Sequence, residues 1–156
     1  MKRVLILANN SIGLYNFRFE LIQKLQKSNY EVYFSVPQNK DDQKVQLLIQ
    51  SGAKYIHTPM NRRGMNPIED LKLINLYKKI IKDINPDVIL TYTIKPNIYG
   101  GILSRFMKIP YISNITGLGT AVDNKGVLQL ITLLLYKIAL KKAHCVFFKT
   151  KKIWNF

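Results

Sequence analysis

Residues 66–92 read NPIEDLKLINLYKKIIKDINPDVILTY, and this stretch holds one complete helix and the strand that follows it. Asn66 is a natural N-cap, Pro67 suits the first helical position, and Asn85-Pro86 stops the helix. The pattern therefore predicts a helix over residues 67–84, followed directly by a buried strand. Spacing on the helix predicts a buried stripe made of Ile68, Leu71, Ile74, Ile81 and Ile84.

The same alternation of short apolar runs and helical stretches extends along the whole chain. Two further helical stripes are expected, one at Phe17, Leu21, Ile22 and Leu25 and one at Val45, Leu48 and Ile49. Alternation of this kind predicts an α/β, Rossmann-like doubly wound, mostly parallel sheet of about six strands with the order 3-2-1-4-5-6. The strands are expected at Val4–Ala8, Val32–Val36, Tyr55–His57, Val88–Tyr92, Tyr111–Ile115 and Cys145–Phe148.

Composition fits a single folded domain. The chain has 156 residues, of which 47% are hydrophobic and 11% aromatic, which excludes intrinsic disorder and a disulfide scaffold. It has one cysteine, Cys145, and its first ten residues do not resemble a secretion signal, so we expect a cytoplasmic protein.

The most apolar stretch, residues 127–140, is too short to span a bilayer. A core helix is favoured there over a helix lying in a membrane interface.

The charge is strongly positive. Lys and Arg number 24 against 9 Asp and Glu, which gives a formal charge of +15. Such a surplus suits nucleic acid, anionic lipid headgroups or phosphorylated small molecules. The alternative is that lysines such as Lys78 and Lys79 simply solvate helix faces.

In a doubly wound sheet, ligands bind at the carboxyl ends of the strands. The loop after the first strand carries only Gly13 where a dinucleotide fingerprint needs three glycines, and no Walker A loop is present. This loop opens a helix, where free N–H groups and Arg18 could face an anion. The alternative is that Asn10 or Ser11 merely caps the helix.

Three more polar loops follow later strands. Arg62 and Arg63 suit bidentate phosphate binding, although solvated loop arginines are the alternative. Residues 91–101 combine hydroxyls, a lysine and an amide with Gly100-Gly101, a pair that lets a helix approach the sheet closely. Residues 114–120 form a second glycine-bearing loop. Together these loops are expected to ring one crevice.

Four motifs carry a resemblance to a known family: LANNSIGLYNFR at residues 7–18, NRRGMNP at 61–67, TYTIKPNIYGG at 91–101 and NITGLGTA at 114–121. In this order they resemble the N-terminal domain of bacterial family 4-like glycosyltransferases, over nearly the whole chain. The resemblance implies the N-terminal half of a GT-B fold, in which two Rossmann-like domains face across a cleft. It also implies transfer of a sugar, with retention of anomeric configuration, from a nucleotide-sugar to an acceptor that in many members is lipid-linked.

In that family the N-terminal domain mainly holds the acceptor. The resemblance places Gly13 near the donor diphosphate, Arg62 and Arg63 at acceptor phosphate, and the later loops against acceptor and transferred sugar. Many relatives carry a histidine in the loop after the fifth strand, where this chain has Thr116 or its neighbours. No catalytic histidine is therefore assigned, and His57 and His144 are expected to be structural. The expected substrate-binding residues are Gly13, Asn16, Arg18, Arg62, Arg63, Tyr92, Thr93, Lys95, Asn97, Thr116, Gly117 and Gly119.

We expect residues 1–148 to form the domain and residues 149–156 a basic tail, with the donor domain absent. A truncated or frameshifted product, a deliberately cut domain and the acceptor subunit of a two-chain transferase all fit this ending. No metal and no cofactor are expected beyond the nucleotide-sugar of the complete enzyme, and the chain alone should be inactive.

The expected setting is cell-surface polysaccharide synthesis, such as that of lipopolysaccharide or capsule, at the inner face of the plasma membrane. The expected partners are a lipid-linked or oligosaccharide acceptor, an anionic membrane surface, and a donor-binding domain or chain. The rival is a non-catalytic basic module that binds anionic membrane or nucleic acid. Nucleic acid is not expected, because the chain lacks an RNA-binding signature and a recognisable helix-turn-helix.

Overall fold

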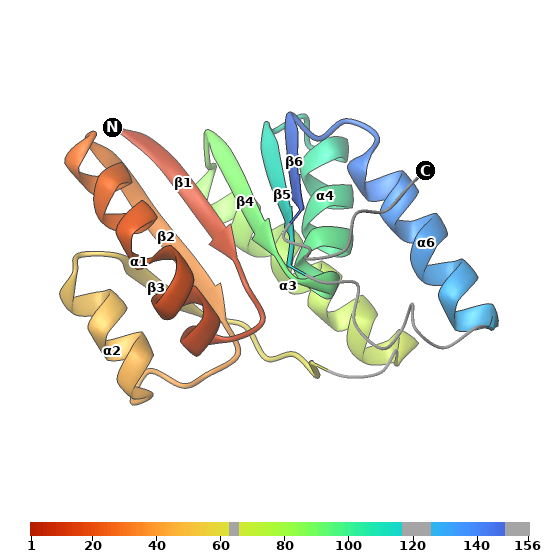
Figure 1. The fold of residues 1–156 in the computed structure, drawn as a ribbon, viewed down its shortest axis with the longest axis horizontal. Coiled ribbons are helices and arrows are strands. Elements are labelled where there is room, and N and C mark those ends of the chain that lie inside the picture. Colours follow the sequence, from red (N-terminus) through yellow and green to blue (C-terminus); the bar gives the residue numbers. More distant parts are fainter. Residues whose placement is uncertain (63–65, 117–125, 149–156) are drawn as a thin grey trace.

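The computed structural model describes residues 1–62, 66–116 and 126–148, the side chain of Leu128 excepted; the predicted tail at 149–156 lies outside them. Strands and helices alternate as the sequence predicts (Figure 1). The strands are β1 (Lys2–Leu7), β2 (Tyr30–Val36), β3 (Lys54–His57), β4 (Val88–Tyr92), β5 (Tyr111–Ile115) and β6 (Cys145–Phe148). The helices are α1 (Ser11–Lys27), α2 (Gln43–Gln50), α3 (Pro67–Ile84), the short π-helical turn η1 (Pro96–Gly100), α4 (Gly101–Phe106) and α6 (Val127–Leu140).

The six strands form one sheet with the order β3-β2-β1-β4-β5-β6. All neighbouring strands are parallel, and β1 lies at the centre with Val4 opposite Val32 on one side and Leu5 opposite Ile89 on the other. The predicted fold class and strand order are therefore confirmed. The reversal of strand order falls between β1 and β4, which is where ligands bind in folds of this type.

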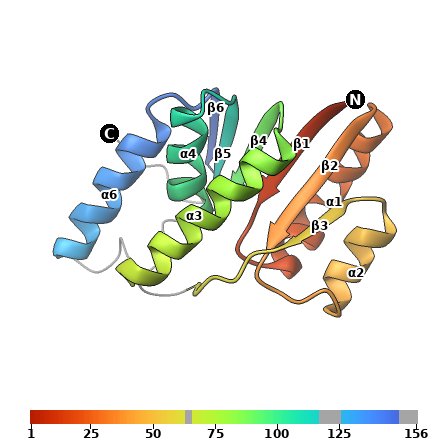
Figure 2. The same cartoon turned by 180° about the vertical axis from the view of Figure 1, so that it is seen from behind.

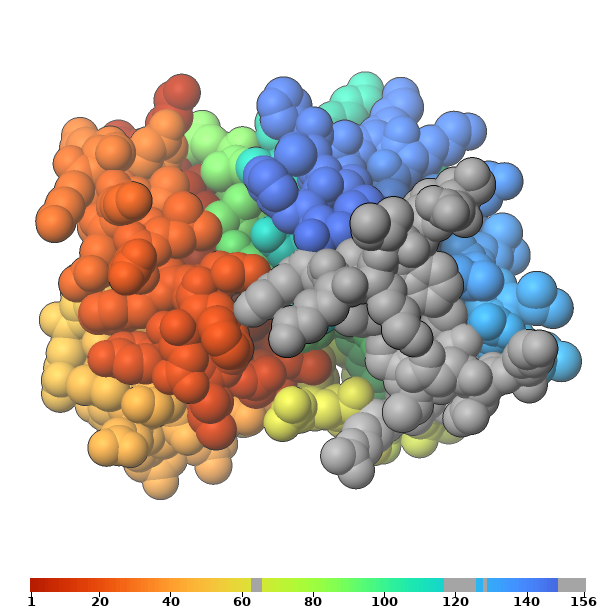
Figure 3. Space-filling model, in the orientation of Figure 1, coloured from red at the N-terminus to blue at the C-terminus, as the bar shows by residue number. Residues whose placement is uncertain are grey.

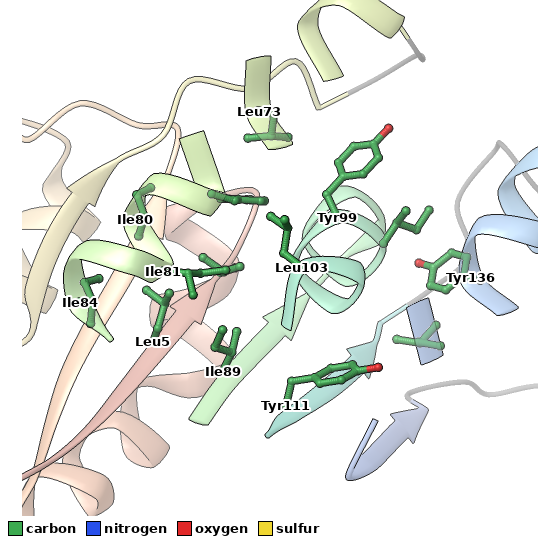
Figure 4. Close-up of a cluster of buried hydrophobic side chains, with 14 residues drawn as sticks. Leu5, Leu73, Ile80, Ile81, Ile84, Ile89, Tyr99, Leu103, Tyr111 and Tyr136 are labelled. Carbon is green, nitrogen blue, oxygen red and sulfur yellow. The ribbon is translucent and has the colours of Figure 1, made fainter. Parts of the chain in front are cut away.

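Helices cover both faces of the sheet (Figure 2). Helices α1 and α2 pack on one face around a cluster that includes Ile6, Ile22 and Phe34. Helices α3, α4 and α6, together with η1, pack on the other face around Leu5, Tyr77 and their neighbours. Figure 4 shows this second cluster, in which Ile81, Leu103 and Tyr111 come from three different elements.

Helix α3 begins and ends where the sequence predicts. The Asn66 side chain accepts a hydrogen bond from the Ile68 N–H at 3.1 Å, and Asn85 ends the helix in the left-handed conformation with a φ of 49°. The predicted buried stripe is partly wrong, because Ile68 and Leu71 are exposed. The residues buried instead include Leu73, Tyr77 and Ile80, together with the predicted Ile81 and Ile84.

The error on α3 has a geometric cause. The buried side of α3 runs through Asp70, Leu73, Tyr77, Ile81 and Ile84, so the first turn of the helix already has a buried side chain. Ile68, Leu71 and Ile74 are three residues apart, and this spacing drifts around a helix of 3.6 residues per turn. Ile68 and Leu71 therefore lie on the side of the helix away from the buried stripe.

The predicted stripe on α1 is also partly wrong. Ile22 is buried as expected, but Phe17 is 63% exposed and Leu21 is exposed as well, while Leu14 takes the buried place near the start of the helix. The first turns of α1 stand beside the carboxyl ends of the strands, where Phe17 lines a cavity. On α2 the prediction holds, because Val45 and Leu48 are fully buried.

Gly100 and Gly101 allow close helix packing, as predicted. A Cβ atom on Gly100 would lie 2.7 Å from Leu7 Cδ1 of the central strand. A Cβ atom on Gly101 would lie 3.2 Å from the carbonyl oxygen of Ala139 in α6. A side chain at Gly100 would push its helix away from the sheet, and one at Gly101 would push α4 away from α6.

Helix α6 is a core helix on one side only. Its buried residues are Thr132, Tyr136 and Ala139, and the Tyr111 hydroxyl of β5 donates a hydrogen bond to the Ala139 carbonyl. The opposite side of the helix exposes large apolar side chains. The expectation of a core helix is therefore correct for the inner face and wrong for the outer face. No helix within the described ranges is long and apolar enough to cross a membrane.

Candidate functional site

A crevice runs along the carboxyl ends of the strands. It consists of two adjoining cavities, of about 390 Å³ and about 220 Å³, that share Asn9, Thr93 and Thr116 in their walls. These three residues follow β1, β4 and β5, which are neighbours around the reversal of strand order. The crevice therefore lies where the sequence places it, and it contains most of the described residues predicted to bind substrate.

The larger cavity has aromatic walls. Phe17 of α1 and Tyr92 at the end of β4 line it, together with Arg18. The Arg18 guanidinium lies 4.9 Å from the centre of the Tyr92 ring, a cation–π contact. Burial raises the pKa of the Tyr92 phenol, and Arg18 offsets part of that rise. The ring is therefore neutral at physiological pH and offers an apolar face with a hydroxyl at its edge.

The N-terminus of α1 is capped internally. The Gly13 N–H donates to Asn10 Oδ1 at 2.5 Å, and the Ser11 N–H donates to Gln38 Oε1 at 2.8 Å. The expectation of free amides facing an anion is thus wrong for these two groups, and the alternative, an Asn10 cap, is confirmed. Gly13 still lines the cavity, where a Cβ atom would come within 3.0 Å of Asn10 Oδ1.

Thr93 is the most unusual residue of the crevice. It has a φ of 76°, a conformation that a β-branched residue rarely adopts, and it lines both cavities. Its buried hydroxyl has no hydrogen-bond partner among the described residues. Strained backbone and an unsatisfied polar group both cost stability, and such features concentrate at functional sites.

The smaller cavity is basic. Arg62 and Lys95 line it, and the Arg62 side chain is exposed. Lys95 is already engaged, because its ammonium lies 2.7 Å from Asp70 Oδ1 of α3 in a buried ion pair. Among the described residues that line this cavity, Arg62 is therefore the accessible cation. A third cavity of about 570 Å³ continues the crevice along α3 and shares Met60 and Lys95 with the second.

Two predicted substrate residues do not face the crevice. Asn97 is fully buried: Thr91 Oγ1 donates to its Oδ1 at 2.7 Å, and its Nδ2 donates to the Asn114 carbonyl at 2.9 Å. Asn97 thus joins η1 to β4 and β5 and lines neither of the first two cavities. Asn16 is exposed on α1 and also lines neither.

The remaining predictions divide into two groups. Arg63, Gly117 and Gly119 lie outside the described residues. His57 and His144 line none of the three cavities; His57 Nε2 is 3.2 Å from the Pro37 carbonyl, and the His144 backbone N–H donates to the Tyr111 carbonyl.

Sequence reasoning missed several residues of the crevice. Asn9, two residues after the end of β1, could have been found from the rule that ligands bind at strand ends. Phe17 was assigned to the core because its spacing fits a helical stripe. Asp70 was missed because its partner, Lys95, is 25 residues away in the sequence. No local pattern connects the two.

A six-stranded parallel sheet of this order, with a crevice at the strand reversal, is a Rossmann-like domain. The sequence of residues 3–150 matches the model of the family described as Glycosyl transferase 4-like, and the chain belongs to that family.

One curated relative is an N,N'-diacetylbacillosaminyl-diphospho-undecaprenol alpha-1,3-N-acetylgalactosaminyltransferase of Campylobacter jejuni subsp. jejuni. It is 31% identical over 147 residues, which cover 91% of this chain and 38% of the relative. The chain therefore spans less than half the length of that relative.

Solved structures share the fold. Acinetobacter baumannii MurG is similar with a TM-score of 0.64 and 15% identity, over 100% of this chain and 43% of that one. S. aureus MnaA with UDP has a TM-score of 0.67 and 16% identity, over 97% of this chain and 40% of that one. Likeness at these identities concerns the fold alone.

Proposed function

We propose that this chain is the acceptor-binding domain of a retaining glycosyltransferase, which moves a sugar from a nucleotide-sugar to a lipid-linked glycan in cell-surface polysaccharide synthesis. The observation that carries the proposal is the crevice, in which an aromatic cavity adjoins a basic one. A sugar linked to a diphosphate would match this arrangement, with the sugar ring in the aromatic cavity and the phosphate in the basic one. The family and the lipid-linked substrate in the name of the Campylobacter relative support this assignment.

The aromatic cavity suits the sugar. A volume of about 390 Å³ falls within the usual range for small-ligand pockets. Phe17 and Tyr92 offer apolar surface to the C–H faces of a sugar ring, while Asn9, Thr93 and Thr116 offer hydrogen bonds to its hydroxyls. The orphan hydroxyl of Thr93 would gain a partner when a sugar is bound.

The basic cavity suits the phosphate. The exposed Arg62 guanidinium can make paired hydrogen bonds to phosphate oxygens. Lys95, neutralised by Asp70, supports the loop and adds little net charge. Catalysis requires that the leaving diphosphate of the donor be held as well. A donor-binding domain or chain would supply that part, so the 156-residue chain alone should not transfer sugar.

Isothermal titration tests the proposal. The chain is titrated with a water-soluble, short-chain polyprenyl-diphosphate sugar and, separately, with a nucleotide-sugar. We expect the diphosphate-linked sugar to bind, the nucleotide-sugar to bind more weakly, and a mixture of both to give no product. Tighter binding of the nucleotide-sugar, or robust transfer by the purified chain, would contradict the proposal.

A further inference from the structure

The outer face of α6 exposes apolar side chains that the fold does not use. Val127 is 73% exposed, Leu130 68% and Leu134 58%, and Ile131 is also exposed. These residues lie on the side of the helix opposite the buried Thr132, Tyr136 and Ala139. We call these four residues the outer face of α6. A contiguous apolar face of this kind marks a binding surface.

The charges beside this face have one sign. Lys137 and Lys141 are exposed and continue the line of Leu130 and Leu134 along the helix, since the spacings are four, three and four residues. Residues 126–142 contain three lysines and no acidic residue. A helix with an apolar face, lysines beside it and no acid is typical of helices that lie in the interface of an anionic membrane.

The position of the outer face of α6 points to the same partner. Helices α3 and α6 cover the same face of the sheet and run back from its carboxyl edge, so both begin at the edge that holds the crevice (Figure 1). The exposed Ile68 and Leu71 of α3 also lie near this edge. Figure 3 shows α6 in blue at the rim of the molecule.

We propose that α6 docks the domain on an anionic lipid bilayer, with its apolar N-terminal half among the acyl chains and Lys137 and Lys141 at the headgroups. Lysines bury their aliphatic stems while their ammonium groups stay at the surface. The net charge of +15 adds a general attraction to the same surface. This inference deepens the proposed function, because docking at the edge of the crevice would bring a lipid-linked acceptor to its mouth.

Vesicle flotation tests the docking surface. The full chain is mixed with phosphatidylcholine vesicles that contain phosphatidylglycerol, and with pure phosphatidylcholine vesicles. We expect binding to the anionic vesicles that weakens as salt is added. The double variant Leu130→Gln/Leu134→Gln and the double variant Lys137→Gln/Lys141→Gln should each bind at least tenfold more weakly, by loss of apolar burial and of charge respectively.

Two matched controls sharpen the test. Lys24→Gln/Lys27→Gln removes the same charge from the last turn of α1, on the opposite face of the sheet, and Ile12→Gln removes an exposed apolar side chain from α1. Both variants should bind the anionic vesicles with an affinity within about threefold of that of the unaltered chain, because they change at most the overall electrostatic attraction. Unfolding midpoints of all variants should agree, since every substituted side chain is exposed.

Three results would overturn the inference. The α6 variants could bind vesicles as well as the unaltered chain, or the α1 controls could lose as much vesicle affinity as the α6 variants. The third result is that Leu130→Gln/Leu134→Gln changes only the oligomeric state. The last result would mean that a second copy of the chain covers this face. Titration with the water-soluble acceptor separates the two proposals, because the α6 variants should retain that binding. Vesicle binding without acceptor binding would refute the proposed function and leave the docking surface intact.

Discussion

The ammonium of Lys95 lies 2.7 Å from Oδ1 of Asp70, and the two side chains are only 10% and 8% exposed. This ion pair joins the loop after β4 to the first turns of α3, on the floor of the crevice between its second and third cavities. The buried Asp70 carboxylate therefore fixes the first turns of α3 to this loop. Of the two described cations that line the second cavity, this leaves Arg62 to meet a ligand.

Breaking this ion pair from one side should be costly. Asp70→Asn leaves the Lys95 ammonium buried without its counter-charge, and the free energy of unfolding should fall by about 3 kcal/mol or more. The double variant Asp70→Leu/Lys95→Met removes both charges and should be more stable than Asp70→Asn. Urea unfolding measures both. An equal loss of unfolding free energy in the two variants would mean that side-chain packing, and not the buried charge, stabilises the contact between α3 and the loop after β4.

Replacing Arg62 should weaken acceptor binding and leave the fold intact. Arg62→Ala removes a charge-assisted hydrogen bond of about 1.5 to 3 kcal/mol, so the dissociation constant for the soluble acceptor should rise at least tenfold. The unfolding free energy should change by less than about 0.5 kcal/mol. Lys78→Ala, which removes the same charge from an exposed helix position, is the control. A similar loss in both variants would show that binding depends on net charge alone.

The Thr93 side chain should lower the stability of the fold and strengthen acceptor binding. Thr93→Gly relieves a φ of 76° and removes an unsatisfied hydroxyl, so we expect a gain in stability of about 1 kcal/mol together with weaker acceptor binding. Thr93→Ser keeps the hydroxyl and should retain acceptor affinity. Thermal unfolding and titration report the two effects separately. A Thr93→Gly variant that is less stable than the unaltered chain would contradict the assignment of strain to this residue.

Gly100 should not tolerate a side chain. The added Cβ of Gly100→Ala would lie 2.7 Å from Leu7 Cδ1, and Leu7 is fully buried, so the variant should lose about 1 to 3 kcal/mol of stability. Gly126→Ala is the matched control, because no atom of the described residues lies within 4 Å of its added Cβ. Chemical denaturation compares the two. Equal stability of both variants would mean that the helical layer can shift to make room.

The sequence was sufficient to predict the strand order, the caps of α3 and the place of the crevice, because periodicity, capping residues and strand ends are local signals. It was not sufficient for Ile68, Leu71 and Phe17. Their spacing fits a helical stripe, but which side of each helix faces the sheet depends on the tertiary structure. The ion pair of Lys95 with Asp70 and the left-handed Thr93 also depend on tertiary structure and have no local signature.

The central claim is that the crevice holds the sugar and phosphate of an acceptor. Amide chemical-shift mapping of the nitrogen-labelled chain, titrated with the soluble diphosphate-linked sugar, tests it most directly. The account predicts that the amides of Asn9, Thr93 and Thr116 shift first and with a single dissociation constant, and that Arg62→Ala weakens the response at all three. Shifts that leave these amides unchanged and gather on α2 or on the outer face of α6 would contradict it.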